Sequence, residues 1–360
     1  MKVLIITNSS SGLYQFRKDL IKEFNKRDYK VEVVTPSSGF INELENLGCE
    51  LEFFNIDRRG KNLLSEFKLI LKYKKIIKDK KPDKIISYTI KPNLYCGLIT
   101  RFLGIDFYPN ITGLGTAFQK DNLFKKFIIF IYKTSFKKAN KVFFENNSNK
   151  ELFIKEGISN NNNSICLNGA GVNLDEFEFS TLPPFETVNF IFIGRIMKEK
   201  GINELFEAIK IIKAKYKKTR FFILGGLEED YKEYIDNMKR DGLLEYYGEV
   251  KDVREYIKFS HCILLPSYHE GMSNALLEGA AMGRSLITSN IPGCREAVKD
   301  NESGFLHRVK DSKDLANKIE KFILLSNEEK ISFGKESRKI VEEKFDKKKV
   351  VQKTIENIFK

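Results

Sequence analysis

The chain has 360 residues, of which 42% are hydrophobic and 31% are charged. This length favours two domains over a single core, and the hydrophobic fraction excludes a globally disordered protein. The formal net charge of +13 indicates an anionic partner, which can be a nucleic acid, a phosphorylated substrate or an acidic membrane surface.

The positive charge is concentrated in one part of the chain. Residues 51–150 hold 21 Lys and Arg against 8 Asp and Glu, and this difference of +13 equals the excess of the whole chain. The rest of the sequence is therefore balanced. The alternative explanation is that these lysines are ordinary solvated side chains in a lysine-rich composition.

The sequence shows no sign of export or of a membrane span. Its first residues, "MKVLIITNSSSG", are typical of a buried strand and a turn and lack the features of a signal peptide. The longest strongly apolar run of the basic region, residues 127–132, is far shorter than the roughly 20 residues that a membrane span needs. Five scattered cysteines without a CxxC pair indicate neither a disulfide framework nor a zinc site. We therefore expect a cytoplasmic protein.

Strand-like and helix-like segments alternate along the first half of the chain. Amphipathic stretches such as residues 14–27 and 63–80 separate short apolar runs that are typical of buried strands. This alternation indicates βαβ units and a doubly wound parallel sheet. The predicted strands are residues 2–7, 31–35, 51–56, 84–89 and 141–146.

The same pattern begins again in the second half, where residues 201–216 are a predicted helix. Between the halves, residues 167–189 contain several glycines and a Pro-Pro pair and are interpreted as a linker. Residues 314–345 are predicted to form one long helix. The predicted strands of this half are residues 188–194, 219–226, 261–266 and 284–290.

These patterns predict an α/β protein with two Rossmann-like domains that face each other across a cleft. We expect residues 1–180 to form the first domain and residues 181–340 the second, with residues 341–360 as a C-terminal helix that packs back on the first. Ligands of such sheets bind beyond the carboxyl ends of the strands.

The segment "EGMSNALLE", residues 270–278, follows a predicted strand and enters a predicted helix. Asn274 and Glu278 are four residues apart and therefore share one face of the helix start, where an anion is favoured. Because carboxylates accept hydrogen bonds from sugar hydroxyls, Glu270 and Glu278 can hold the two ends of a sugar nucleotide. The alternative is a surface glutamate and a helix acid favoured by the dipole. The amides that can line this crevice belong to Gly271, Met272 and Ser273.

A second group of candidates follows the predicted strand 188–194. Gly194 and Arg195 end this strand, and Lys200 precedes the next helix. The planar fork of an arginine and the flexible charge of a lysine both suit a diphosphate leaving group. Surface solvation is the alternative for each cation, but the flanking glycines at a strand–helix turn favour function.

Three loops of the first half carry weaker signals. The loop after the first strand contains Gly12, a candidate for contact with the donor because it permits close approach to the backbone, although the loop lacks the GxxxxGK[ST] pattern of a P-loop. The loops that begin at residues 88 and 110 also follow strands, and ordinary turn residues are their alternative interpretation. Candidates for contact with an acceptor in these two loops are Lys91, Asn93, Thr112 and Gly113.

The segments "GRIMKEKG", "GEVKDVREYIKFSHCILLPSYHEGMSNALLEGAAMG" and "GCREAV" with "ESGFL" resemble the retaining glycosyltransferases of family 4, which have the GT-B fold. Glu270 and Glu278 match their E-x7-E element. The resemblance is strongest across residues 188–310. First-half segments such as "YTIKPNLYCG", "NITGLG" and "NGAGVNLDEF" are similar to the branch that builds O-antigen, capsule or N-glycan precursors on undecaprenyl diphosphate. That branch includes α-1,3-N-acetylgalactosaminyltransferases that use UDP-GalNAc.

The resemblance implies a role for each motif of the second half. Arg195 and Lys200 would hold the donor diphosphate, and Glu278 would bind the ribose hydroxyls. Glu270, together with the backbone of residues 271–274, would hold the transferred sugar. The catalytic residues implied are therefore Glu270, Arg195 and Lys200. The nucleotide base would lie against the "GEVKD" turn, at Val250 and Lys251.

The histidines depart from the family pattern. Many members have a first-domain histidine near the reacting carbon, whereas His261, His269 and His307 all lie in the second half. We therefore carry over no catalytic histidine. Retention without a positioned base suggests front-face attack, in which the departing phosphate oxygen accepts the proton of the acceptor.

No metal ion or other cofactor is expected. The acidic segment 227–231, "LEEDY", is interpreted as the solvated start of a helix. The charge on the leaving group would instead be neutralised by Arg195, Lys200 and the helix dipole.

The expected function is transfer of a sugar, GalNAc or another hexose or hexosamine, from a UDP-sugar to a lipid-linked saccharide. One alternative is a UDP-sugar epimerase of the same fold, which needs first-domain acid–base residues that the sequence does not offer. The other is a nucleic-acid-binding protein, which would account for the charge. It should show aromatic residues among basic motifs or a recognition helix, and neither is evident, so no nucleic-acid partner is expected.

Two basic segments, residues 58–84 and 120–141, combine lysines with large apolar residues at near-helical spacing. This composition suits a helix that lies in a membrane interface, and a packed domain helix is the alternative. We favour the packed helix for 58–84 and the membrane for 120–141, which places the enzyme on the inner face of the cell membrane. The lysines predicted to meet acidic headgroups are Lys120, Lys125, Lys126, Lys133, Lys137 and Lys138.

Overall fold

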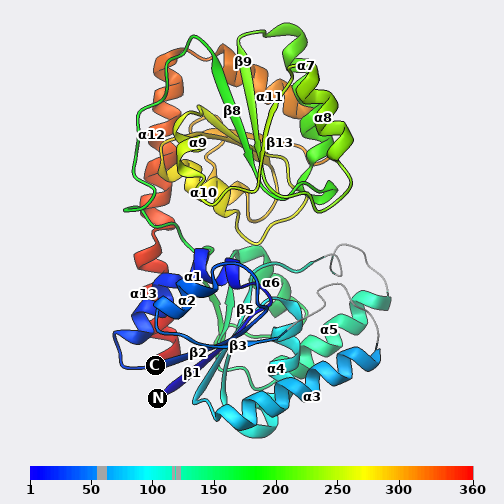
Figure 1. Ribbon diagram of the computed structural model, residues 1–360, viewed down its shortest axis with the longest axis vertical. Helices are drawn as coiled ribbons and strands as arrows, with labels where there is room; N and C mark the ends of the chain where they lie inside the picture. The colour runs from blue at the N-terminus through cyan, green and yellow to red at the C-terminus, as the bar shows by residue number, and fades with distance from the viewer. Residues whose placement is uncertain (55–62, 116–117, 119–122, 360) are drawn as a thin grey trace. The chain divides into compact units, whose positions relative to one another are not determined.

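The computed structural model describes residues 1–54, 63–115, 118 and 123–359. The chain forms two units, one composed of Met1–Ala170 with Lys347–Lys360 and the other of Gly171–Asp346. Each unit contains one parallel sheet with helices packed against it (Figure 1). The predicted pair of Rossmann-like domains is therefore confirmed.

The first unit is built on a seven-stranded sheet with the order β3-β2-β1-β4-β5-β6-β7, and every neighbouring pair of strands is parallel. Its central strands β1 and β4 are buried and largely apolar, as expected for a sheet that helices cover on both faces. In the register, Val3 pairs with Val31 on one side and with Lys84 on the other. The strands are β1 Lys2–Ile6, β2 Lys30–Thr35, β3 Glu50–Phe53, β4 Lys84–Tyr88, β5 Asp106–Ile111, β6 Val142–Phe144 and β7 Ser164–Cys166.

The helices of the first unit form two layers. Buried residues of α3, α4 and α5 share one core with one face of the sheet, and buried residues of α1 and α13 share another core with the opposite face. The Tyr108 hydroxyl of β5 donates to the carbonyl of Ile358 at 3.0 Å, which ties α13 to the sheet. The helices are α1 Ser10–Asn25, α2 Ile41–Asn46, α3 Leu63–Lys80, α4 Ile90–Leu103, α5 Leu123–Phe136, α6 Asn147–Lys155 and α13 Lys347–Phe359.

Every strand predicted in the first half is present, but β5 and β7 were missed. β5 lies inside the sheet between β4 and β6, where a proline is unusual because it cannot donate a hydrogen bond to a neighbouring strand. Pro109 nevertheless occupies this strand, opposite Ser87. The proline and the following Asn110 interrupted the apolar pattern that identified the other strands.

The second unit has a six-stranded parallel sheet with the order β10-β9-β8-β11-β12-β13. Its strands are β8 Val188–Ile193, β9 Thr219–Leu224, β10 Glu245–Gly248, β11 Cys262–Leu265, β12 Ser285–Ser289 and β13 Gly304–His307. Its α-helices are α7 Ile202–Lys215, α8 Lys232–Arg240, α9 Arg254–Lys258, α10 Asn274–Ala281, α11 Ser312–Leu324 and α12 Asn327–Lys344, and short 3-10 helices occupy η2 Lys198–Lys200 and η3 Arg295–Ala297.

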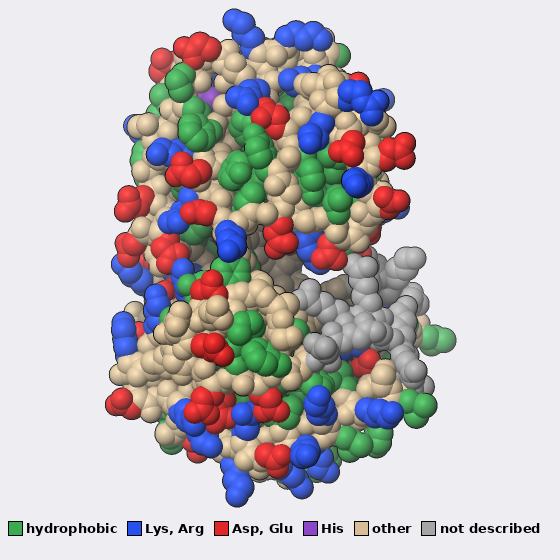
Figure 2. All heavy atoms as spheres, in the orientation of Figure 1, with side chains coloured by type: hydrophobic (Ala, Val, Ile, Leu, Met, Phe, Trp, Pro, Cys, Tyr) green, Lys and Arg blue, Asp and Glu red, His purple; other side chains and the backbone are tan. Residues whose placement is uncertain are grey.

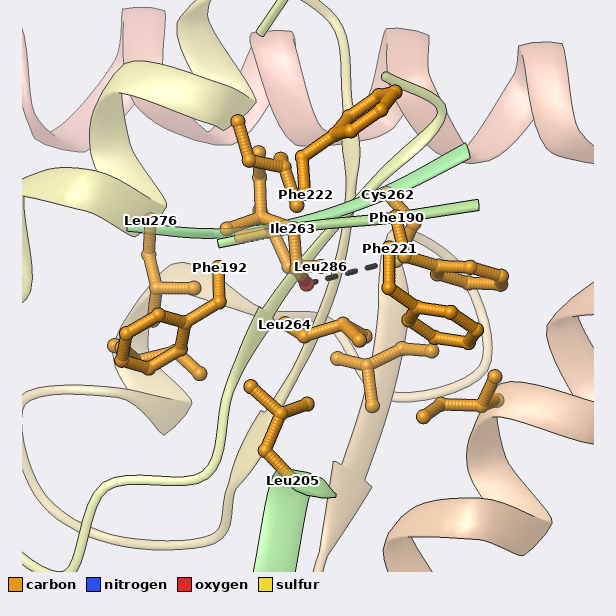
Figure 3. Close-up of a cluster of buried hydrophobic side chains, with 14 of the residues drawn as sticks. Phe190, Phe192, Leu205, Phe221, Phe222, Cys262, Ile263, Leu264, Leu276 and Leu286 are labelled. Carbon is orange, nitrogen blue, oxygen red and sulfur yellow. Dashed lines mark hydrogen bonds between the residues drawn. The ribbon is translucent and has the colours of Figure 1, made fainter. Parts of the chain in front are cut away.

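The core of the second unit is formed by side chains of its central strands and of the helices beside them. Phe190 and Phe192 of β8 are fully buried, and Phe190 stacks on Phe221 of β9 with ring centroids 5.1 Å apart (Figure 3). Leu276 of α10 joins the same cluster and fixes the start of that helix against the sheet (Figure 3). The loops that leave the carboxyl ends of the strands therefore start from a rigid base.

The predicted linker belongs largely to the second unit, so the predicted domain boundary at 180/181 is corrected to 170/171. The fully buried Arg284 donates hydrogen bonds to the carbonyl of Ser180 at 2.7 Å and to that of Met282 at 2.6 Å. Burial lowers the pKa of the Arg284 guanidinium to about 10, so it remains protonated at neutral pH. A buried cation that satisfies several carbonyls holds this segment on the domain surface.

The single long helix predicted for residues 314–345 is wrong, because the chain bends between α11 and α12. The side chain of Ser326 accepts from the amide of Glu329 at 3.1 Å, while the carboxylate of Glu329 accepts from the amide of Ser326 at 2.7 Å. This reciprocal capping box starts α12. The second boundary between the units lies at 346/347, six residues after the predicted position at 340/341.

Candidate active site

The candidate site is built at the carboxyl ends of neighbouring strands of the second sheet. β8 lies between β9 and β11, and parallel pairing brings the loops after these three strands to one edge. The loop after β8 carries Arg195 and η2, and the loop after β11 carries residues 266–273. Residues that are distant in the sequence therefore come together here.

Lys200 and Glu270, which the sequence placed in one crevice, form an ion pair. Lys200 Nζ contacts Glu270 Oε1, and the hydroxyl of Ser267 donates to the same oxygen at 2.8 Å. The side chains are 20% and 13% exposed, so the pair is shielded from solvent but reachable. The hydroxyl of Ser267 orients the carboxylate, a contact that sequence reasoning missed.

The segment after Glu270 enters α10 as predicted. Ser273 is the N-cap, and its hydroxyl accepts from the amide of Leu276 at 3.4 Å. Asn274 and Glu278 are both half-buried on the first turns of α10, whereas Met272 points into the core and is 5% exposed. Any role of Met272 therefore depends on its backbone, as the sequence suggested.

A glycine in a neighbouring loop supports this segment. Gly293 has a φ of +84°, and a Cβ there would lie 2.5 Å from the carbonyl oxygen of Gly271 and 2.8 Å from that of Glu270. The carbonyl of Gly293 accepts from the amide of Ser273 at 2.9 Å. A side chain at position 293 would therefore displace the backbone that carries Glu270.

Arg195 follows β8 and meets an acidic residue that the sequence analysis did not select. Arg195 Nη1 lies 3.5 Å from Glu228 Oε1, and both side chains are partly exposed. Glu228 follows β9, and its amide donates to the carbonyl of Ile196 at 3.1 Å. The pairing of β8 with β9 brings the two loops together, so the "LEEDY" segment is part of the site's surroundings.

We expect Glu228→Gln to tighten the binding of UDP by up to about fivefold. In the role predicted for Arg195, a diphosphate competes with Glu228 for the guanidinium, and exposed ion pairs contribute up to about 1 kcal/mol. Isothermal titration with UDP measures the effect. Glu233→Gln, on the exposed face of α8, makes the same change in net charge away from Arg195. An equal gain in both variants would assign the effect to overall charge and not to this pair.

Glycines allow the chain segments that follow β8 and β9 to lie close together beside Arg195. Gly225 has a φ of +144°, and a Cβ there would lie only 1.8 Å from the carbonyl oxygen of Gly194. The amide of Gly225 donates to the carbonyl of Gly248 at 2.7 Å, just before the predicted base-binding turn. In this turn Val250 is half-buried against the core and Lys251 is exposed.

Gly12 lies in the first turn of α1 and not in an open loop. Its amide donates to the hydroxyl of Ser9, the N-cap, at 3.0 Å. A Cβ at position 12 would meet that hydroxyl at 3.1 Å. The structure therefore gives Gly12 a role in capping α1, while its predicted contact with a donor remains a prediction.

The predicted loop at residue 88 is a helix from Ile90 onward, which changes the interpretation of Lys91 and Asn93. Lys91 Nζ contacts Glu66 Oε1 of α3 at 2.6 Å. Asn93 is 1% exposed, accepts from Ser87 Oγ at 2.6 Å and donates to the carbonyl of Asn110 at 2.8 Å. The prediction that Asn93 contacts the acceptor is therefore corrected: this buried side chain supports the ends of β4 and β5.

Thr112 and Gly113 remain accessible after β5. Both are half-buried, and Gly113 has a φ of +156°. No atom of the described residues lies within 4 Å of a Cβ built at Gly113. Their predicted contact with an acceptor is compatible with this open surface.

Two of the three histidines are structural. His261 is fully buried, its Nδ1 accepts from the amide of Asn189 at 3.0 Å, and burial lowers its pKa to about 4. Burial also lowers the pKa of His307. His269, beside Glu270, is partly exposed, and its Nε2 lies 3.4 Å from Glu199 Oε2.

The described part of the chain contains no group of three or more His, Cys, Asp or Glu side chains arranged to hold a metal ion. The positive groups that face the candidate site are Arg195, Lys200 and the amino terminus of α10. This arrangement can bind a diphosphate and stabilise negative charge that develops on it.

Comparison with protein families agrees with the two-unit fold. Residues 175–340 match the family of glycosyl transferases group 1, and residues 2–146 match the glycosyl transferase 4-like family. The chain thus has the GT-B fold, with a glycosyl transferase 4-like domain followed by a glycosyl transferases group 1 domain.

Individual relatives share this organisation over most of their length. The chain is 28% identical to N,N'-diacetylbacillosaminyl-diphospho-undecaprenol alpha-1,3-N-acetylgalactosaminyltransferase of Campylobacter jejuni, over 92% of this chain and 91% of the relative. It is 25% identical to UDP-Gal:alpha-D-GlcNAc-diphosphoundecaprenol alpha-1,3-galactosyltransferase of Escherichia coli, over 86% and 84%. The fold superposes on Anabaena HepE, solved with UDP-glucose, with a TM-score of 0.81, 17% identity and 99% coverage of both chains.

Proposed function

We propose that this glycosyltransferase moves a sugar, GalNAc or another hexose or hexosamine, from a UDP-sugar to a polyprenyl-diphosphate-linked saccharide, with retention of the anomeric configuration. The observation that carries the proposal is the Lys200–Glu270 pair beside the amino terminus of α10, within the residues that match the glycosyl transferases group 1 family. The activities named for the relatives from Campylobacter jejuni and Escherichia coli support an undecaprenyl-diphosphate-linked acceptor in polysaccharide or glycan assembly.

Each residue of the site has a defined part in the proposed reaction. Arg195 and Lys200 bind the diphosphate, Glu278 binds the ribose hydroxyls and Glu270 binds the transferred sugar. The oxygen of the acceptor hydroxyl bonds to the anomeric carbon while the bond from that carbon to the diphosphate oxygen breaks. The hydroxyl proton passes to the departing oxygen. The two cations stabilise the charge that develops there.

We place the enzyme on the cytoplasmic face of the membrane that carries its acceptor. Among the residues that the structure describes, no helix combines the length and the apolar character required to cross a bilayer. Attachment therefore rests on surface contacts in this proposal. The lysine-rich region between residues 51 and 150 supports an anionic membrane partner.

The proposal is tested by pairing donor binding with transfer. A panel of UDP-sugars is screened for thermal stabilisation, and a donor at about 100 times its Kd is expected to stabilise the fold by about 2.7 kcal/mol. The stabilising donor is then offered with a polyprenyl-diphosphate-linked saccharide, and NMR of the product reports the anomer.

Three outcomes would contradict the proposal. An inverted anomer would remove the retaining mechanism. Epimerisation of the UDP-sugar without an acceptor would favour the epimerase. A salt-sensitive shift with DNA or RNA, without binding of any UDP-sugar, would favour a nucleic-acid-binding protein.

A further inference from the structure

Large apolar side chains are exposed on two helices of the first unit. On α3 the residues Leu64, Phe67 and Leu71 face solvent, and Phe67 is 60% exposed. On α5 the exposed residues include Leu123 at 83% and Phe130 at 65%. We call this set the apolar surface, and its members are Leu64, Phe67, Leu71, Leu123, Phe124, Phe127 and Phe130.

These residues are not needed to bury the helices against their own domain. The opposite face of α3 already packs Tyr73 and Ile77 into the core, and that of α5 packs Tyr132 and Phe136. The packed helix expected for residues 58–84 is confirmed in its described part by α3, while the membrane contact expected for residues 120–141 stays a prediction. Both helices pack on the sheet with one face and expose apolar residues on the other.

α3 and α5 belong to one layer of the unit. α4 contacts both of them and shares their core against the sheet. It packs closely on α5, since a Cβ at Gly97 would lie 2.5 Å from the carbonyl oxygen of Ser135. The outer faces of α3 and α5 therefore lie on the same side of the sheet, at the lower right of the first unit in Figure 1.

Basic residues surround the apolar surface. Figure 2 shows hydrophobic and basic side chains mixed along the lower right of the first unit, where Figure 1 places α3. α5 contains no acidic residue, and Glu66 of α3 is engaged by Lys91 and by the hydroxyl of Tyr95. Lys120 lies outside the described residues. The exposed lysines of the two helices are Lys68, Lys72, Lys74, Lys75, Lys78, Lys126 and Lys133.

The described part of the second unit has no comparable surface. Its exposed large apolar residues come from different elements, for example Phe259 after α9, Leu324 of α11 and Ile331 of α12. Single exposed apolar residues are normal, whereas seven on two helices of the same layer indicate an interaction site.

We propose that α3 and α5 together form a docking surface for an anionic lipid bilayer. The apolar residues enter the boundary between headgroups and acyl chains, while the lysines contact acidic headgroups. This occupant follows from the joint presence of aromatic and basic side chains, since an apolar protein partner would not require the lysines. The inference rests on the proposed function in one respect, namely that the acceptor is held in a membrane.

Vesicle flotation tests the docking surface without any enzymatic reaction. Vesicles contain phosphatidylcholine alone or in equal parts with phosphatidylglycerol. The wild-type chain is expected to float with the anionic vesicles. Replacement of Phe67, Leu71, Phe127 and Phe130 by Ser is expected to lower the bound fraction at least about tenfold, because membrane binding scales with buried apolar area. The matched control, Phe259→Ser with Leu324→Ser, removes exposed apolar residues from the second unit and should bind as wild type.

The depth of insertion is measured in the native fold with single tryptophans. The sequence contains no tryptophan, so Phe127→Trp and Phe259→Trp each introduce one fluorophore. Trp at position 127 is expected to shift to shorter wavelength and to be quenched by brominated lipid on anionic vesicles. Trp at position 259 should do neither.

Several results would overturn the docking surface. Unchanged flotation of the serine variant is one, and an unquenched Trp at position 127 is another. If the wild type is a dimer that the serine variant dissociates while flotation is unchanged, the surface is a contact between copies of the chain. Transfer to a short-chain soluble acceptor separates the two proposals, because it should persist in the serine variant. If the wild type does not transfer a sugar to this soluble acceptor, the proposed function is contradicted, but the flotation result still holds.

Discussion

Replacing Lys200 or Arg195 by Ala is expected to lower kcat by roughly a hundredfold or more. In the proposed reaction each change removes a positive charge that stabilises the departing diphosphate, and loss of one such group typically has an effect of this size. Lys200→Ala also leaves the carboxylate of Glu270 with the hydroxyl of Ser267 but without its cation. The measurement is steady-state transfer with a soluble acceptor analogue.

Lys198 provides a matched control for these variants. It is an exposed lysine of the same 3-10 helix, and its substitution by Ala makes the same change in net charge as Lys200→Ala. Lys198→Ala should keep the activity of the wild type, and circular dichroism should show that all three variants are folded. Full activity of Lys200→Ala or Arg195→Ala would refute the assignment of that residue to the diphosphate.

The two glutamates of the site are expected to affect different kinetic constants. Glu278→Ala should mainly raise the KM for the donor, because contacts to ribose hydroxyls are equal in the ground and transition states. Glu270→Gln should mainly lower kcat, because the amide retains an oxygen for Ser267 but loses the negative charge that the proposed function places beside the reacting sugar. Initial rates over a range of donor concentrations separate the two constants.

Glu199→Gln controls for a change of charge near the reacting sugar, because Glu199 lies beside His269 in the same region. This variant should leave both constants close to those of the wild type. If Glu270→Gln and Glu278→Ala both change KM alone, then Glu270 has no special role at the reacting sugar.

Much of the fold was predictable because buried parallel strands have continuous apolar sequences. β1 and β11 show this pattern and were found. β5 was not, since Pro109 interrupts its apolar run and its place in the sheet comes from the strands on either side. A strand that is held in place by the adjacent strands is difficult to recognise from its own sequence.

The candidate site was predictable where one loop carries several functional residues. Residues 270–278 and 194–200 were selected from their glycines, charges and position after strands, and Lys200 does meet Glu270. The contact of Arg195 with Glu228 was not predictable, because it depends on the pairing of β8 with β9. The burial of Asn93 was equally unpredictable, because the local sequence does not distinguish an asparagine in a surface turn from a buried asparagine that supports two strands.

The joining of the linker to the second unit constrains how the two units can move. The amide of Val172 donates to the carbonyl of Phe345 at 2.9 Å, and Val172 forms a parallel bridge with Asp346. The two places where the chain leaves the second unit, next to Val172 and next to Asp346, therefore lie beside each other. Gly169 and Gly171 adjoin this point with φ values of +79° and +70°. A change in the orientation of the units can be absorbed by a few backbone torsions there, without breaking a strand of either sheet.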